Sequence, residues 1–235
     1  MNELTRINKR MSELGLCSRR EADTLIDKGA VLVNGQKAVM GQKVASADTI
    51  TLTGKKPAKK QYLAYYKGRG VITHSPAAGE TDIATRLKKD YKLTGIYPVG
   101  RLDKDSEGLM ILTDDGRVTG PLLDPDSNNT KIYEVFLDKP VTGAFLKQME
   151  AGVNIEGYHT KTTTVDKKTP KRIHLSLTEG KKHQIRRMCA ALGYQVQSLK
   201  RLQILNVELG TLKPNQYRKI SGEELQTFLE TLGIK

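Results

Sequence analysis

Acidic side chains concentrate in residues 100–116, on both sides of a continuous apolar run at residues 109–112. Carboxylates gathered in this way serve either as ligands of a metal ion or as catalytic groups that attack a substrate or stabilise charge. Gly100 permits a sharp bend and Asp114-Asp115-Gly116 is a turn signal, so the apolar run has the length and borders of a buried strand. Asp103 is therefore expected on a loop that leads directly into a rigid element.

One interpretation of these carboxylates is a calcium-binding loop. Positions one, three, five, six and twelve of such a loop are filled here by Asp103, Asp105, Glu107, Gly108 and Asp114. The context disfavours calcium, because Gly95, Pro98 and Gly100 leave no place for the helix that enters such a loop. A shorter Asp also stands where the loop usually has a bidentate Glu. The sequence therefore favours a catalytic role for the cluster.

The same stretch resembles a signature of bacterial RNA pseudouridine synthases that act on ribosomal RNA. It reads Gly-Arg-Leu-Asp, then Ser-x-Gly-Leu, an apolar run, Leu-Thr and Asp-Gly, with every main position filled between residues 100 and 116. In that family the Asp of Gly-Arg-Leu-Asp is the catalytic residue. The resemblance implies that Asp103 is the catalytic carboxylate of an enzyme that isomerises uridine.

Two further motifs extend the resemblance. Lys131, Ile132 and Tyr133 match a Lys-x-Tyr motif, whose Tyr in the family stacks on the target base and handles the proton on carbon five. The alternative for Tyr133 is an ordinary core tyrosine. Residues 179–187 read Glu-Gly-x-x-His-Gln-Ile-Arg-Arg, and the resemblance implies that Arg186 approaches and pairs with Asp103. The alternative for Arg186 is an exposed helix arginine. Basic residues beside these motifs are predicted to contact RNA: Arg101, Lys181, Lys182 and Arg187.

The implied reaction breaks the glycosidic bond, turns the uracil over and rejoins it through carbon five. Nothing is oxidised and no group enters or leaves, so a single carboxylate can serve and no metal or organic cofactor is expected. The sequence accordingly offers no metal-ligand cluster and no dinucleotide-binding glycine motif. The target base must leave its helix to be reached. Whether the carboxylate attacks the ribose or the base stays open.

The first 53 residues predict a small separate unit. A short helix at 7–14 is followed by a second that begins at Ser18, with Glu21 in the capping-box position, and by a hairpin around Asn34-Gly35. This pattern resembles the S-four type of RNA-binding domain. Its apolar positions leave a basic face, for which the alternative is a merely solvated surface: Arg6, Lys9, Arg10, Arg19, Arg20, Lys28, Lys37 and Lys43.

Residues 54–60 contain Gly, Pro and four Lys without apolar periodicity, which predicts a linker. Residues 61–235 then predict the catalytic domain, so the fold class is α+β with a mixed, mainly antiparallel sheet. Strands are expected at 62–67, 109–112, 131–137, 157–165 and 171–177, and helices around Phe145 and Ile185. Ser221 with Glu224 predicts a capping box for the last helix. Lys67-Gly68-Arg69-Gly70 replaces the Lys-Pro-x-Gly of the family, and we expect this departure to loosen the loop.

Composition restricts the partners. The chain has 235 residues, a net charge of +13 and a pI near 9.6, which suits a polyanion such as nucleic acid or an anionic membrane. No apolar run has the length of a membrane span and residues 1–20 are too charged for a signal peptide, so a cytoplasmic protein is expected. Cys17 and Cys189 are predicted to be reduced, packed thiols.

These observations lead to three hypotheses. The first is an RNA pseudouridine synthase acting on large-subunit (23S) ribosomal RNA, free or within a ribosomal subunit or assembly intermediate, as a monomer without membrane contact; small-subunit (16S) RNA is the alternative target. The second is a non-catalytic ribosome-associated RNA-binding protein, which leaves the Asp103 signature unexplained. The third is a glycoside hydrolase that pairs Asp103 with Asp105 or Asp114. A chain with no Trp and three Phe is a poor candidate for that role.

Overall fold

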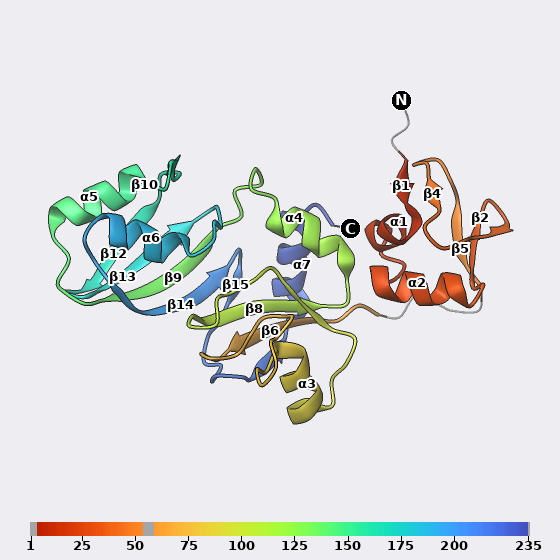
Figure 1. Cartoon of the computed structure of the whole chain (residues 1–235), viewed down its shortest axis with the longest axis horizontal. Coiled ribbons are helices and arrows are strands. Elements are labelled where there is room, and N and C mark those ends of the chain that lie inside the picture. The colour runs from red at the N-terminus through yellow and green to blue at the C-terminus, as the bar shows by residue number, and fades with distance from the viewer. Residues whose placement is uncertain (1–3, 54–58, 235) are drawn as a thin grey trace.

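A computed structural model describes residues 4–53 and 59–234. Within these ranges the chain forms a small N-terminal unit and a larger body built on one long sheet (Figure 1). Most of the predicted linker, residues 54–58, lies outside the described residues, so the predicted domain boundaries stay a prediction. No helix in the described ranges has the length and apolar composition needed to cross a bilayer.

The small unit has the predicted order of helix, helix and hairpin. Its helices are α1 (Ile7–Glu13) and α2 (Arg19–Asp27), and its three-stranded sheet contains β2 (Val31–Val33), β3 (Gln36–Lys37) and β5 (Ile50–Leu52). A separate pair joins β1 (Thr5–Arg6) to β4 (Lys43–Val44). The N-cap prediction is confirmed, because the Ser18 hydroxyl accepts the Glu21 N–H at 3.2 Å. Ile7, Met11, Ala22 and Val31 form its buried core.

The large sheet has the strand order β12-β13-β9-β14-β8-β6-β16, with β15 paired to β14 and β7 to β8. Only the β8 and β14 pair is parallel among the described strands of this sheet, so the predicted mainly antiparallel α+β fold is confirmed. The strands are β6 (Tyr62–Lys67), β7 (Tyr97–Val99), β8 (Glu107–Thr113), β9 (Lys131–Leu137), β12 (Thr164–Thr169), β13 (Arg172–Leu177), β14 (Val196–Ile204), β15 (Val207–Glu208) and β16 (Tyr217–Lys219). A separate small pair joins β10 (Asn154–Ile155) to β11 (Tyr158–His159).

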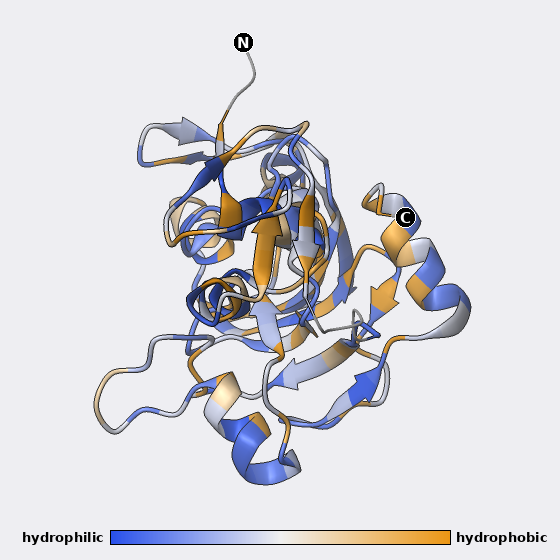
Figure 2. Cartoon of the chain, turned by 90° about the vertical axis from the view of Figure 1, so that its right-hand side faces the viewer, coloured by the Kyte–Doolittle hydropathy of each residue, from blue (hydrophilic) through white to orange (hydrophobic). Residues whose placement is uncertain are grey.

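Helices cover both faces of this sheet. One apolar layer packs α3 (Ile83–Tyr91), α5 (Gly143–Ala151) and α6 (Gln184–Ala191) against the strands, and the other packs α4 (Thr119–Leu123) and α7 (Gly222–Thr231). A 3-10 turn, η1 (Gly116–Val118), precedes α4. In Figure 2 the helices carry both hydrophilic and hydrophobic residues, as expected for helices with one face against a sheet. Residues 109–112 of β8 point alternately into the two layers, which explains why this strand is a continuous apolar run.

The parallel junction of β8 and β14 depends on one glycine. Gly108 has a φ of +114°, and a Cβ at this position would clash with the backbone oxygen and nitrogen of Arg201. Only glycine tolerates both the conformation and the close approach. This contact places the loop that carries Asp103 beside the start of β14.

Two expectations about local structure are wrong. Residues 157–165 are not one strand, because the chain turns away after β11: Thr160 Oγ1 accepts the Val153 N–H and Lys161 N–H donates to Glu179. Ser221 precedes α7 without a side-chain cap, and Glu224 instead pairs with Arg218. The looser loop expected after β6 stays a prediction; Gly68 N–H, which a proline would lack, donates to Asn215 Oδ1 at 3.1 Å.

Candidate active site

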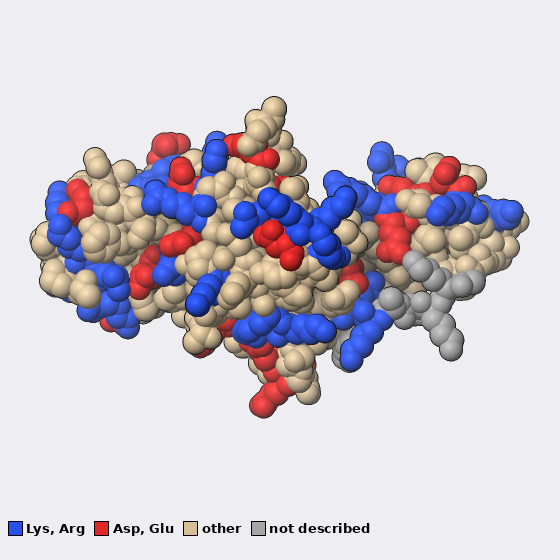
Figure 3. All heavy atoms as spheres, turned by 90° about the horizontal axis from the view of Figure 1, so that it is seen from below, with Lys and Arg blue, Asp and Glu red and all other residues tan. Residues whose placement is uncertain are grey.

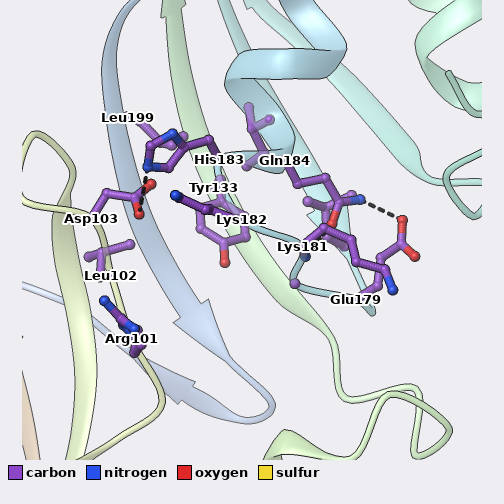
Figure 4. Close-up of a pocket in the computed structure, with 13 residues that line it drawn as sticks. Arg101, Leu102, Asp103, Tyr133, Glu179, Lys181, Lys182, His183, Gln184 and Leu199 are labelled. Carbon is purple, nitrogen blue, oxygen red and sulfur yellow. Dashed lines mark hydrogen bonds and ion pairs between the residues drawn. The ribbon is translucent and has the colours of Figure 1, made fainter. Parts of the chain in front are cut away.

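A pocket of about 500 Å³ lies where the loop before β8, strands β9 and β14 and the turn before α6 meet (Figure 4). It brings together five of the predicted site residues from three distant parts of the chain: Arg101, Asp103, Tyr133, Lys181 and Lys182. Arg186 and Arg187 do not line it. The pocket has an apolar wall and a few polar groups, which is typical of a small-molecule site. The wall is formed by Leu102, Leu177, Ile185 and Leu199.

The loop that carries Asp103 is held by hydrogen bonds from the loop after β6. The Thr73 hydroxyl donates to the Leu102 carbonyl at 2.8 Å and accepts the Leu102 N–H at 3.1 Å. Gly70 N–H donates to the Lys104 carbonyl at 2.8 Å. The Asp103 carbonyl accepts the Ser106 N–H at 3.1 Å. The backbone on both sides of Asp103 is thereby held before any substrate binds.

Lys67 completes this support from within the fold. Its side chain is fully buried, and Nζ donates to the carbonyl oxygens of Val71 (2.8 Å), Gly68 (3.2 Å) and Lys104 (3.4 Å). Burial lowers the pKa of the Lys67 amine to about 8, an effect that the nearby Asp103 carboxylate partly opposes. In the sequence, Lys67 stands out only as part of the Lys67-Gly68-Arg69-Gly70 motif, and nothing there indicates its structural role.

The Asp103 carboxylate is 38% exposed and faces the pocket, with its Oδ1 3.4 Å from His183 Nε2. His183 precedes α6 in a left-handed conformation (φ 52°) that few residues other than glycine and Asn adopt, and this conformation directs the imidazole toward the loop (Figure 4). His183 was not among the predicted site residues. It lies inside the Glu-Gly-x-x-His-Gln motif, and that position was the signal that could have identified it.

Tyr133 lies on β9 at the floor of the pocket and is 8% exposed. It stands opposite Leu175 of β13 and Arg201 of β14, so both neighbouring strands fix its position. Within the described residues its hydroxyl has no hydrogen-bond partner. The ring therefore offers a rigid stacking surface, and its phenol remains available to a bound group.

The predicted ion pair between Arg186 and Asp103 is not formed in the described part of the chain. Arg186 instead donates to the Val196 carbonyl at 3.2 Å, the Asp105 carbonyl at 3.3 Å and Ser106 Oγ at 3.5 Å. The Arg186 guanidinium donates to the backbone of the loop, and the Asp103 carboxylate lies against His183. Arg186 thus contacts the loop that carries Asp103 rather than the carboxylate itself.

A buried carboxylate shapes the turn on the opposite side of the pocket. Glu179 is 4% exposed and accepts hydrogen bonds from Tyr158, Gln184 and the Lys161 N–H. Gln184 Oε1 in turn accepts the Lys181 N–H. This network holds the turn whose two lysines, Lys181 and Lys182, are exposed at the rim of the pocket, where their charge is available to a phosphate.

The other predicted RNA contacts fall into two groups. Arg187 forms an ion pair with Glu156 at 2.7 Å and so connects α6 to the turn after β10. On the small unit, Lys9 and Arg10 each lie 3.7 Å from Glu13, whereas Arg6, Arg19, Arg20 and Lys37 are exposed. In Figure 3 the Lys and Arg side chains extend along both the sheet body and the small unit. Cys17 and Cys189 are both buried, as predicted.

Comparison with known proteins follows the same division of the chain. The RNA pseudouridylate synthase family model matches residues 61–191, and the S4 domain model matches residues 5–50. The dual-specificity RNA pseudouridine synthase RluF of Salmonella typhi is 38% identical, with 94% of this chain and 77% of that protein covered. The ribosomal large subunit pseudouridine synthase B of Bacillus subtilis is 32% identical, with 95% of each chain covered. A crystal structure of a pseudouridylate synthase aligns with a TM-score of 0.70 at 28% identity and covers 95% of this chain and 99% of that one.

Proposed function

Because this chain belongs to the RNA pseudouridylate synthase family and has an N-terminal S4 domain, we propose that it converts uridine to pseudouridine in large-subunit ribosomal RNA. Pseudouridine synthase activity on RNA follows from the family. The choice of large-subunit RNA is the proposed part, and the name of the Bacillus subtilis relative supports it. Family membership overturns the glycoside hydrolase alternative.

One observation supports this chemistry above all: Asp103 lines the same pocket as the Tyr133 ring and three cationic side chains. A flipped-out uracil fits between these groups, with its ring on Tyr133 and its flanking phosphates near Arg101, Lys181 and Lys182. In this proposal the Asp103 carboxylate attacks or stabilises the substrate while the glycosidic bond breaks, and the Tyr133 phenol handles the proton on carbon five. Neither step calls for a metal or an organic cofactor.

Two neighbours position the carboxylate in this proposal. His183 contacts Asp103 directly and limits the directions in which the carboxylate points. Arg186 holds the same loop through the Asp105 carbonyl and connects it to the start of β14. We assign both residues to placement of Asp103.

The small unit is assigned to affinity rather than chemistry. Residues 1–60 carry 12 basic and 6 acidic residues, and residues 61–235 carry 27 and 20, so the basic excess is proportionally larger in the N-terminal quarter. None of the pocket residues belongs to this part of the chain. The S4 domain then supplies phosphate contacts that hold a monomeric enzyme on ribosomal RNA, free or within a subunit.

The test is to map pseudouridines in total RNA from a strain that lacks this protein and from the same strain complemented with wild type or with Asp103→Asn. We expect one or more large-subunit sites to disappear, to return with wild type and to stay absent with Asp103→Asn at equal protein level. A missing site confined to small-subunit RNA would replace the proposed target, and an unchanged map would favour a non-catalytic RNA-binding role.

A further inference from the structure

A second cavity, of about 480 Å³, lies between the small unit and the sheet body, away from Asp103. On one side it is lined by the start of α2, with Ser18, Arg19 and Arg20, and on the other by Tyr97 and Pro98 of β7 and by His74. We call it the interdomain groove. None of these residues has a role in the pocket described above, and the chemistry of the isomerisation does not require them.

The two walls of the interdomain groove are held together by close packing. Gly116 of η1 lies against α1 so tightly that a Cβ there would clash with the Ser12 hydroxyl. The Arg117 side chain lies over Gly15, where an added Cβ would be 2.9 Å from Nε. Arg117 is itself fixed by an ion pair at 2.8 Å to the buried Asp115, whose carboxylate also accepts the Tyr62 hydroxyl at 2.6 Å. The groove is thus a built feature with one preferred shape.

Tyr97 and Arg20 face each other across this groove. The guanidinium carbon of Arg20 lies 6.0 Å from the centroid of the Tyr97 ring, and the Tyr97 residue is 39% exposed. Both groups are flat, and stacked bases are spaced about 3.4 Å apart, so a base between them requires about 7 Å. Arg20 is exposed and its side chain has no ion pair within the described residues. A shift of about 1 Å in this side chain is enough to admit a base.

The charges around the groove suit a nucleic acid. The two acidic residues that line it are already engaged: Asp115 by Arg117, and Asp114 by the Gln61 N–H at 2.8 Å. Arg19, Arg20 and His74 are exposed and are available to a phosphate. An aromatic ring, a guanidinium and nearby cations together form the combination that binds unpaired bases.

We propose that the interdomain groove binds one unpaired base of the RNA substrate, stacked between Tyr97 and Arg20, with its phosphate near Arg19. This inference rests on the proposed function, because it takes the same RNA as ligand. Strand β7 leads directly into the loop of Asp103, and the six residue-to-residue steps from Tyr97 to Asp103 span at most about 22 Å. The base held there is therefore a near neighbour of the target uridine, and the groove helps to select which uridine enters the pocket.

The test compares binding of the full-length variants to an unmodified in vitro transcript of large-subunit ribosomal RNA across a salt series. Tyr97→Ala should weaken binding by about 5- to 150-fold, the range for losing one base stacked on an aromatic ring, without changing the salt slope. Tyr97→Phe should bind like wild type, because it keeps the ring. Arg20→Ala should weaken binding and also reduce the salt slope by about one unit.

Matched controls separate stacking from general effects. Phe136→Ala removes another aromatic that is similarly exposed (37%), and Lys28→Ala removes a cation at the other end of α2. Phe136→Ala should leave affinity unchanged, and Lys28→Ala should weaken binding less than Arg20→Ala does.

Several results would overturn the inference. Wild-type affinity in a folded Tyr97→Ala variant excludes stacking, and an equal loss in Tyr97→Phe shows that the hydroxyl matters instead of the ring. If Tyr97→Ala unfolds, the folded pair Tyr97→Phe and Tyr97→Leu decides, since Leu fills the space without a stacking surface and should bind weakly. If wild type forms no pseudouridine while these binding differences hold, the proposed function fails and the groove assignment stands.

Discussion

Replacing Lys67 with Met gives a quantitative test of how the Asp103 loop is supported. Met keeps the length and apolar stem of the side chain but has no donor, so the carbonyl oxygens of Gly68, Val71 and Lys104 lose a buried partner. Each unsatisfied carbonyl costs about 1–3 kcal/mol. The Met variant no longer buries a charged amine, and near neutral pH this gain in folding free energy partly offsets the cost. The change of stability with pH is therefore the informative quantity.

The magnitude of that change follows from the pKa of Lys67. Burial lowers the pKa to about 8 from an ordinary 10.5, a difference worth about 3 kcal/mol. The folded pKa lies below the unfolded pKa, so the unfolded chain binds more protons between pH 8 and 10.5, and stability rises with pH in this window. Below pH 8 both states carry the charge and the contribution is constant. Lys67→Met abolishes the rise, so the stability advantage of wild type over the variant should grow by about 3 kcal/mol from pH 8 to 10.5.

The assay is urea unfolding followed by circular dichroism at a series of pH values for both proteins. Lys131, whose pKa burial also lowers to about 8, titrates in the same window, but it is present in both proteins and cancels in the difference. Lys88→Met, which removes an exposed lysine, should give a difference that is flat with pH. A flat difference for Lys67→Met as well would refute the argument that Lys67 is buried as a titrating amine beneath the loop.

Further predictions concern the pocket and the small unit. Tyr133→Phe keeps the ring and loses the phenol, so RNA should bind normally while single-turnover product formation slows at least tenfold; normal turnover would remove the hydroxyl from proton handling. His183→Ala should slow turnover about 10- to 100-fold with little change in RNA affinity, and an unchanged rate would show that Asp103 needs no such contact. Activity should survive dialysis against a chelator, and loss that zinc restores on prefolded RNA would contradict the cofactor-free reaction. Residues 61–235 alone should bind ribosomal RNA more weakly and with a shallower salt slope than the full chain, as measured by binding across a series of salt concentrations. An unchanged slope would show that the basic face of the S4 domain makes no phosphate contacts.

The sequence predicted the elements whose local signals agree with their surroundings. The apolar run of β8, the Ser18 N-cap and the Asn34-Gly35 hairpin all formed as expected, since each is determined by residues close in the chain. Asp103 and Tyr133 were brought into one pocket, as the motifs implied. Pro121 is tolerated because it lies in the first turn of α4, where backbone N–H groups have no helical partner.

Strand β14 was missed because its sequence lacks an apolar pattern, although it lies at the centre of the sheet. Arg201 is 5% exposed there and its guanidinium donates to the Leu109 carbonyl at 2.7 Å. From the sequence alone an arginine is expected at the surface, even where a neighbouring strand accepts its hydrogen bonds in the interior. The predicted pairing of Arg186 with Asp103 was wrong for a related reason. The observed contact of Asp103 depends on the left-handed conformation of His183, and Arg186 donates to carbonyl groups that are distant in the sequence.

The parallel pairing of β8 with β14 explains how these distant groups meet. Lys200 of β14 stands opposite Glu107 of β8, so Asp103 and Val196, each four residues earlier, enter the sheet from the same edge. Arg186 donates to the Val196 carbonyl and to the Asp105 carbonyl, and so it joins the two segments where they enter. An arginine suits this position because its planar fork reaches two acceptors at once, whereas a lysine offers a single ammonium. The Asp103 loop is therefore held by Arg186 on the side of β14 and by Lys67 on the side of β6, and the carboxylate between them stays directed into the pocket.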